Sequence, residues 1–470
     1  MYNSIHQLVQ ELTDKIFEKI ELGDIKDLDS LASDVLTDCK MTARDIIQTY
    51  IQWMNEEIRS DKAARKTKGL VLKEKDLPRT ILTELGLISF HRDYYFDKTS
   101  GHHCSVLDRM LGIEKYERIG ASVSAALVSQ ATDCSYEKAA NIVTGGMVSR
   151  QTVHNHILRM HVPDMPVDQD RKPVPVLHVY ADEDHVSMQK PGKEKGKKNK
   201  IVPLVTVTEG TFEKSKGRNE TIHPRHFVDE EFDTKNLWKT VEGYIEKAYD
   251  LEEMKAIYVH GDGGSWIRNG LENISQTKRV MDGYHFHKAL KTIDRMLSTR
   301  KVRTVIISAL KKNDSHRADE YIQELLRMPL TEKEEEQLQK FAGYLFRSWD
   351  AIRRRIVEDV PGSCTEGQIS HVLSERFSRD PQGWSEACLG KLTKARVYQK
   401  NGGKLTKEVF RTKEKKEETY SEYADRIVEE VLQKHYDFSI FDSTPPVFDT
   451  ASGTQILLSR IGKLHGSLIH

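Results

Sequence analysis

The stretch HVYADEDHVSMQK (178–190) puts three carboxylates directly after a segment with the character of a buried strand. The residues HVYA are typical of a strand end, and Asp182, Glu183 and Asp184 follow them. Ionised carboxylates are costly to remove from water unless a positive partner meets them. The stretch therefore predicts that a cation binds near this strand.

The composition indicates a multidomain protein with a heavily charged surface. The chain has 470 residues, of which 38% are apolar and 31% charged, and its 72 basic and 72 acidic residues give a net charge of zero. Any contact with nucleic acid must therefore come from local basic patches. Five cysteines without CxxC spacing argue against a structural zinc site and a disulfide framework. The start reads as an amphipathic helix, and no apolar run approaches the ~20 residues of a membrane span, so we expect a cytoplasmic protein without membrane contact.

Residue patterning divides the chain into several predicted regions. Apolar residues at four-residue spacing predict helices at the start, and β-formers around Gly86 predict a hairpin. After a Pro-rich linker, strands that alternate with helices predict a mixed sheet, which a long helical stretch then interrupts. The predicted fold is multidomain α+β, with a helical N-terminal DNA-binding region before the sheet domain. The regions are 1–75, 76–165, 170–290, 291–360 (a helical insertion), 361–400 (the last helix of the sheet domain) and 401–470 (a basic tail).

Residues 135–160 predict a helix-turn-helix that binds DNA. The first helix is expected to end at Gly145-Gly146, and Ser149 is expected to cap the second helix. The second helix would present polar residues suited to phosphates and bases, namely Arg150, Gln151, His154 and Asn155. From this pair we also expect residues 1–165 to bind DNA by themselves. An ordinary helical hairpin is the alternative, because the motif is short and has no distinctive chemistry.

Acids follow two strands of the predicted sheet and begin a later helix. Asp182 follows HVYA, Asp262 follows IYVHG, and Glu366 begins a helix after PGSCT. The carboxyl ends of strands are where α/β sheets place their sites. Three carboxylates around one point stay ionised only if cations bind between them, and hard cations such as Mg²⁺ take oxygen ligands. Each acid also has a plainer interpretation as a turn, a solvated loop or a helix cap. Asp184 and Glu183 are alternatives for the first ligand.

Four sequence blocks carry a resemblance to a known family. They are ADEDHVSMQ with a Lys-rich loop after it, GDGGSWI, MDGYHFHKAL, and GSCTEGQISHVLSERFSRDPQGWS, within about residues 75–400. In this order the blocks resemble the ISLre group of bacterial insertion-sequence transposases, whose members are often described only as an uncharacterised protein family. The resemblance implies an RNase H-like α/β catalytic domain with a helical insertion. It also implies a DDE triad of Asp182, Asp262 and Glu366 that holds two Mg²⁺ or Mn²⁺ ions, with Asp184 as the alternative ligand.

The resemblance implies a transposase that cleaves and joins DNA strands at the ends of an insertion sequence. The partners would be double-stranded DNA and further copies of the chain, in the nucleoid. Basic residues near the acids are expected to contact the DNA backbone: Lys193, Lys195, Lys197, Lys198, Arg376 and Arg379. The alternatives are an inactive transposase-derived DNA-binding protein and a general metal-dependent nuclease of the same fold.

Overall fold

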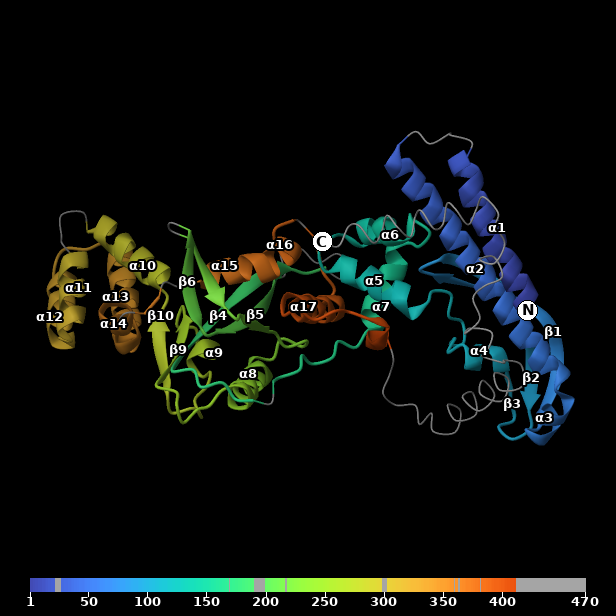
Figure 1. The fold of residues 1–470 in the computed structure, drawn as a ribbon. Coiled ribbons are helices and arrows are strands. Elements are labelled where there is room, and N and C mark those ends of the chain that lie inside the picture. Colours follow the sequence, from blue (N-terminus) through green and yellow to red (C-terminus); the bar gives the residue numbers. More distant parts are fainter. Residues whose placement is uncertain are drawn as a thin grey trace.

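The computed structural model describes residues 1–21, 27–168, 170–189, 199–215, 218–297, 302–358, 360–361, 364–380 and 382–410. The parts follow one another in an elongated row (Figure 1). A helical bundle lies at one end, a mixed sheet lies beside it, and two groups of helices lead to a small N-terminal sheet at the other end. The predicted mixed α+β fold is confirmed.

The N-terminal part is built from long helices and a hairpin. Its elements are α1 (Tyr2–Glu21), α2 (Leu28–Ser60), α3 (Lys62–Thr67), β1 (Leu70–Thr83), β2 (Gly86–Asp97), β3 (His102–Cys104) and α4 (Val106–Met110). The side chain of Asp27 caps α2 by accepting a hydrogen bond from the Ser30 amide at 2.7 Å. Gly86 has a φ of +94°, which allows the tight turn between β1 and β2. The hairpin expected around Gly86 is therefore confirmed.

Three short helices follow: α5 (Ala121–Ala131), α6 (Tyr136–Thr144) and α7 (Arg150–Arg159). Helix α6 ends at Gly145 in the left-handed conformation, and the Ser149 side chain accepts a hydrogen bond from the Thr152 amide at the start of α7. Val153 and Ile157 are fully buried. The two helices and the caps expected from the sequence are confirmed.

The central sheet has the strand order β10-β9-β4-β5-β8. Strand β5 is antiparallel to β4 and β8, whereas β9 and β10 run parallel to β4. The carboxyl ends of β9 and β10 therefore point in the same direction as β4 does. The bounds are β4 (Val176–Ser187), β5 (Asn199–Thr208), β8 (Arg225–Phe227), β9 (Ala256–Gly261) and β10 (Thr277–Met281).

One face of this sheet packs against α8 (Thr234–Ala248) and α9 (Ser265–Arg268). Leu237, Val241 and Ile245 recur at helical spacing on α8 and are buried against the apolar side chains of β4 and β9. The polar hairpin of β6 (Gly210–Ser215) and β7 (Arg218–Ile222) follows β5 and was not expected from the sequence.

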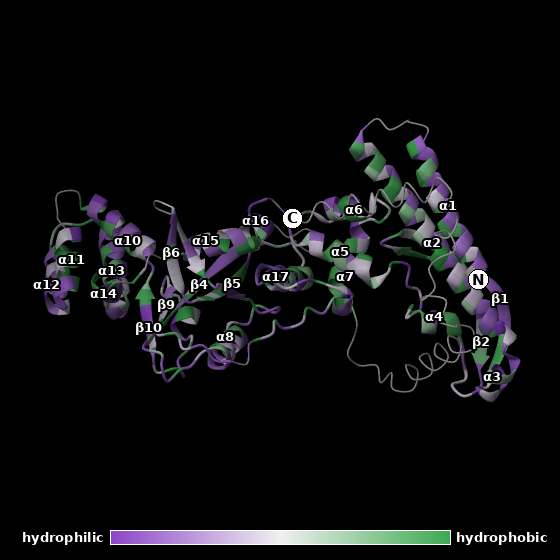
Figure 2. Cartoon of the chain, in the orientation of Figure 1, coloured by the Kyte–Doolittle hydropathy of each residue, from purple (hydrophilic) through white to green (hydrophobic). Residues whose placement is uncertain are grey.

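A bundle of five helices lies between β10 and the last helices of the chain. They are α10 (Gly283–Met296), α11 (Val302–Lys312), α12 (Ser315–Leu326), α13 (Glu332–Arg347) and α14 (Trp349–Val357). Figure 2 shows hydrophobic and hydrophilic residues mixed around these helices, as amphipathic helices require. The bundle has its own core, which includes Leu310, Ile322 and Leu345 with no exposed surface.

The last described helices return to the sheet and to α5–α7. They are α15 (Thr365–Ile369), the π-helical η1 (Ser370–Ser374), α16 (Glu375–Phe377), α17 (Glu386–Lys400) and the 3₁₀ turn η2 (Lys407–Phe410). One hydrophobic core combines Leu127 and Ile157 with Leu389 and Leu392 of α17 and Val202 of β5. The helix pair α6–α7 and the sheet are therefore parts of one packed body.

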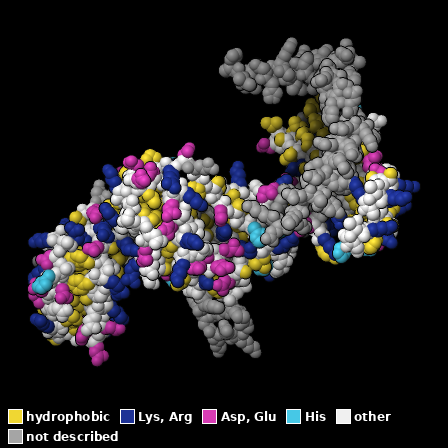
Figure 3. Space-filling view, turned by 90° about the horizontal axis from the view of Figure 1, so that it is seen from below, with side chains coloured by type: hydrophobic (Ala, Val, Ile, Leu, Met, Phe, Trp, Pro, Cys, Tyr) yellow, Lys and Arg dark blue, Asp and Glu magenta, His cyan; other side chains and the backbone are white. Residues whose placement is uncertain are grey.

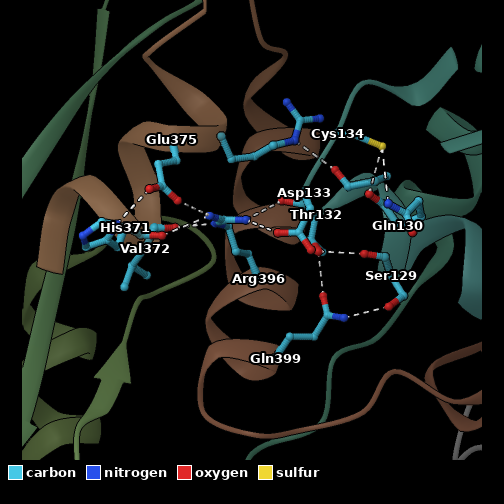
Figure 4. A network of polar contacts seen from close by, with 12 residues as sticks. Ser129, Gln130, Thr132, Asp133, Cys134, His371, Val372, Glu375, Arg396 and Gln399 are labelled. Atoms are coloured by element: carbon cyan, nitrogen blue, oxygen red, sulfur yellow. Dashed lines mark hydrogen bonds and ion pairs between the residues drawn. The ribbon is translucent and has the colours of Figure 1, made fainter. Parts of the chain in front are cut away.

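The side chain of Arg396 joins these helices through a polar network (Figure 4). Its guanidinium donates to the carbonyl oxygens of His371 at 3.0 Å and Thr132 at 2.9 Å, and it forms an ion pair with Asp133. Arg396 is 3% exposed, so these partners replace the water that a charged group otherwise requires. The network fixes α17 to both α5 and η1.

Candidate active site

Three aspartates occupy equivalent positions on three neighbouring strands. The ladder between β4 and β9 pairs Tyr180 with His260, and the same register two residues further puts Asp182 beside Asp262. The ladder between β10 and β9 pairs Met281 with Gly261, so Asp282 comes next to Asp262 on the other side. The amide of Asp282 donates to the Gly261 carbonyl at 2.9 Å and continues this ladder. The register therefore aligns three carboxylates along one edge of the sheet.

The environment of Asp182 disfavours its ionised form. Burial raises the pKa of Asp182 to about 6, from an ordinary value of 3.8. The Glu183 amide lowers this pKa, and the charges of Asp262 and Asp282 raise it further. His285, in the first turn of α10, lowers it. The carboxylates are thus close enough to repel one another.

Backbone amides hold each of these carboxylates in place. The Glu183 amide donates to Asp182 Oδ1 at 2.8 Å, and the Gly264 amide donates to Asp262 Oδ1 at 2.8 Å. Asp282 caps α10 by accepting from the Tyr284 amide at 2.7 Å. Each of these bonds uses Oδ1, so the side chains are oriented without being neutralised.

Gly261 allows the strand that carries Asp262 to lie close to its neighbours. A Cβ atom at this position would be 2.8 Å from Ile267 Cγ2 and 3.1 Å from the carbonyl oxygen of Ala181. The next residue but one, Gly263, has a φ of +89°, which favours glycine. Close packing therefore requires glycine at position 261, and the backbone conformation favours glycine at position 263.

The two alternatives for the first acid are engaged elsewhere. Glu183 lies on the opposite face of β4, and its Oε2 accepts a hydrogen bond from Trp266 Nε1 at 2.7 Å. Asp184 is buried, and both of its carboxylate oxygens accept from Ser378 Oγ, at 3.0 and 2.8 Å. These bonds favour Asp182 over Asp184 and Glu183 as the acid that faces Asp262.

Glu366 lies on α15, which packs against β4. Its side chain is exposed, and it is not among the charges that shift the pKa of Asp182. Within the described ranges, no group of three or more His, Cys, Asp or Glu side chains is arranged to hold a metal ion. The register of the sheet thus aligns Asp182, Asp262 and Asp282, whereas Glu366 comes from a helix outside this register.

A layer of buried rings lies beneath the acids on the same face of the sheet. His178 Nδ1 and His260 Nε2 are 3.1 Å apart, and Tyr180 stacks on His260 with ring centroids 4.6 Å apart. Burial lowers the pKa of His178 to about 4, and burial together with the charge of His178 lowers that of His260 to about 3. Both rings are therefore neutral at pH 7 and do not compensate the acids above them.

The residues expected to read DNA on α7 form a small surface network. Gln151 Nε2 donates to Asn155 Oδ1 at 3.0 Å and lies 3.3 Å from His154 Nδ1. Arg150, Gln151 and Asn155 are exposed, whereas His154 is half-buried against Tyr136. The predicted outward direction of this face is confirmed, and its binding to DNA stays a prediction.

Arg376 is buried, contrary to the expectation that it contacts DNA. Its Nε donates to the Ala131 carbonyl at 3.0 Å, and its guanidinium lies 4.6 Å from the centroid of the Trp384 ring. At 5% exposure it ties α16 to α5 and does not face solvent. Arg379 is exposed, and its contact with DNA stays a prediction.

The remaining basic residues expected to contact DNA lie outside the described residues. These are Lys193, Lys195, Lys197 and Lys198, which come between β4 and β5 in the sequence. On the face seen in Figure 3, Lys and Arg are interspersed with Asp and Glu rather than gathered in one basic stripe. No helix in the described part of the chain is long and apolar enough to cross a membrane.

Comparisons with known proteins place the chain among uncharacterised relatives. The model of an uncharacterised protein family, UPF0236, matches residues 23–416. A UPF0236 protein of Caldanaerobacter subterraneus subsp. tengcongensis is 35% identical over 367 residues, which are 77% of this chain and 75% of the relative. Its name joins eleven locus labels. A second UPF0236 protein of that organism, whose name joins four labels, is 34% identical over the same shares of both chains.

A solved structure also aligns with the chain. It is a chain of the Drosophila P element transposase strand transfer complex, with 12% identity and a TM-score of 0.20. The alignment covers 74% of this chain and 92% of that chain. A TM-score this low does not establish a shared fold.

Proposed function

This chain belongs to the UPF0236 family, and we propose that it is a DDE transposase of the ISLre group, which cleaves and transfers DNA strands at the ends of an insertion sequence. The observation that carries the proposal is the in-register pair of Asp182 and Asp262 on the neighbouring parallel strands β4 and β9. The pair repels, because the charge of Asp262 raises the pKa of Asp182, and a divalent cation would relieve that repulsion.

The architecture supports an RNase H-like catalytic domain. A mixed five-stranded sheet carries the two aspartates, and the helical bundle α10–α14 separates Asp262 from the helix of Glu366. This order of sheet, insertion and final acid is the one that the sequence resemblance implies. The packing of α15 against β4 supports Glu366 as the third acid.

The acids have the chemistry that a hard cation requires. Mg²⁺ is usually held by one or two carboxylates together with water and substrate phosphates, rather than by a complete protein cage. Asp182 and Asp262 would supply the first carboxylates, and Glu366 or the neighbouring Asp282 would supply the third. When bound, two Mg²⁺ or Mn²⁺ ions would supply Lewis-acid activation of the phosphodiester. The protein would hold the DNA phosphate in place, and its neutral histidines would keep the base of the site uncharged.

Double-stranded DNA is the proposed partner. Helix α7 would read its sequence, and the basic segment 190–198 would run along its backbone. Further copies of the chain would join the active complex on that DNA, and the protein would act at the nucleoid. An enzyme that joins two DNA ends needs contacts with both of them, which is the reason for expecting an oligomer.

The number of related genes favours mobility over the alternative of an inactive DNA-binding relic. A relative whose name joins eleven locus labels in one organism is a protein with many copies. Repeated insertion of an element with an active transposase produces such copies, whereas a resident regulator does not require them. The UPF0236 paralogues therefore support the enzyme.

The test is strand cleavage by the purified full-length protein in Mn²⁺. The substrate is duplex DNA that contains the end of the element around the gene. We expect cleavage by the wild type and background levels with Asp182→Asn or Asp262→Asn, while Glu246→Gln, an exposed acid on α8, acts as the matched control. DNA binding without cleavage by the wild type would support the inactive relative instead.

The same assay identifies the third acid. Glu366→Gln and Asp282→Asn each remove one candidate carboxylate and keep the shape of the side chain. We expect Glu366→Gln to abolish cleavage. Wild-type cleavage by Glu366→Gln, together with loss in Asp282→Asn, would assign the role to Asp282.

A further inference from the structure

The helical insertion reaches the acidic edge of the sheet. Helix α14 packs beside β10, and α13 ends at Ser348, immediately before α14 (Figure 1). A Cβ atom on Gly263, next to Asp262, would lie 3.7 Å from Ser348 Oγ. The turn between α13 and α14 is therefore close to the loop that carries Asp262.

Tyr344 is one helical turn before Ser348, and the Ser348 amide donates to the Tyr344 carbonyl at 3.2 Å. Its hydroxyl oxygen is buried and has no hydrogen-bond partner among the described residues. Buried hydroxyls without a partner are rare in folded proteins, because they lose their bonds to water and gain nothing in return. The hydroxyl of Tyr344 therefore requires an explanation.

The charges of the proposed site act on this hydroxyl. Burial raises the pKa of Tyr344, and the charges of Asp262 and Asp282 raise it further. The phenol thus stays protonated in the working pH range and is a hydrogen-bond donor. The ring itself packs against the core of the insertion, so the side chain is fixed in position.

We propose that the Tyr344 hydroxyl donates a hydrogen bond to a phosphate oxygen of DNA bound at the edge formed by Asp182, Asp262 and Asp282. The inference rests on the proposed function and extends it, since it makes the insertion a contributor to the site rather than a spacer. The hydroxyl needs an oxygen atom as its hydrogen-bond acceptor. A water molecule on a bound cation is the alternative to the phosphate oxygen. A donor aimed at a phosphate stabilises the charge that develops there during strand cleavage.

The experiment compares Tyr344→Phe with Tyr321→Phe in the full-length protein. Tyr321 lies on α12 and packs against the same core, so it is the matched control for removing a hydroxyl. Three quantities are measured: the kcat and KM of Mn²⁺-dependent cleavage, the affinity for Mn²⁺ alone by electron paramagnetic resonance, and the affinity for inorganic phosphate in Mn²⁺ by calorimetry.

We expect Tyr344→Phe to lower kcat by about 10- to 100-fold, as loss of one bond to a charged oxygen does, and to leave Mn²⁺ affinity nearly unchanged. It should weaken phosphate binding by roughly 10-fold, while Tyr321→Phe changes none of these quantities. Unchanged kcat and phosphate affinity would overturn the proposal. Loss of Mn²⁺ affinity would overturn it in favour of a cation-bound water. If the wild type cleaves no DNA, the proposed function fails, and the phosphate measurement still decides the role of Tyr344.

Discussion

Asp182→Asn should abolish cleavage and also make the metal-free protein more stable at neutral pH. Burial, with the charges of Asp262 and Asp282, raises the pKa of Asp182 to about 6 from 3.8. Ionisation of this group therefore opposes folding at neutral pH. Asparagine has the same shape, and its side-chain oxygen can still accept the hydrogen bond from the Glu183 amide.

The magnitude follows from the pKa difference between the folded and unfolded states. A shift of about two pKa units corresponds to about 3 kcal/mol, and partial exposure of Asp182 to solvent reduces this to roughly 1–2 kcal/mol. Between pH 3.8 and about 6 the folded state binds more protons than the unfolded state, so wild-type stability falls as the pH rises through this window. The gain in unfolding free energy of Asp182→Asn over the wild type should be complete at pH 7.5 and nearly absent at pH 4.

The assay is urea unfolding of metal-free wild type and variant at both pH values. The fluorescence of Trp238 and Trp266, which pack against the sheet, follows the transition. Asp262→Asn is the comparison variant. We expect it to gain less unfolding free energy than Asp182→Asn, because Asp262 is exposed. Equal stability of wild type and Asp182→Asn at pH 7.5, or an equal gain at both pH values, would refute the reasoning.

Three further changes test other parts of the molecule. Arg396→Met should cost about 1–3 kcal/mol of unfolding free energy, because it removes the donor of the Thr132 and His371 carbonyl oxygens. The exposed Arg379→Met should be neutral by thermal unfolding. Gly270→Ala should destabilise by about 1–3 kcal/mol, because its Cβ would lie 2.3 Å from Trp238 Cε2. Gly243→Ala on α8, with open space around it, should stabilise the protein instead. Replacing four loop lysines by serine should lower the salt slope of DNA binding by about four times 0.9, and an unchanged slope would mean that the loop is merely solvated. These are Lys193, Lys195, Lys197 and Lys198.

Sequence patterning predicted the elements of the site better than their assembly. An apolar strand followed by an aspartate was recognised at Asp182 and Asp262. Asp282 follows β10 in the same way but is not among the acids singled out from the sequence, because MDGYHFHKAL serves there only as one of the four sequence blocks. The signal was the repeated apolar-strand-then-Asp pattern. Its meaning depends on the register between parallel strands, which the sequence does not show.

Tertiary packing places Arg376 differently from the sequence expectation and joins the N-terminal half to α17, whereas DNA binding by residues 1–165 alone stays a prediction. An arginine on a helix is normally exposed, and the sequence does not show that a carbonyl of α5 and the ring of Trp384 enclose Arg376. Residues 1–165 were expected to bind DNA alone. A chain that ended there would expose Leu127 and Ile157, which are buried in the core shared with α17.

That shared core fixes the distance between helix α7 and the acidic edge of the sheet. If α7 reads a DNA sequence as proposed, the span from the bound base pairs to the phosphate at Asp182 depends on side-chain packing, and the length of the linker at 161–175 does not set it. Lengthening the linker would leave the cut where it is. If base pairs are inserted between the recognised sequence and the original cleavage site, the protein should cut at the same distance from the recognised sequence as before. The cut would then no longer fall at the original cleavage site.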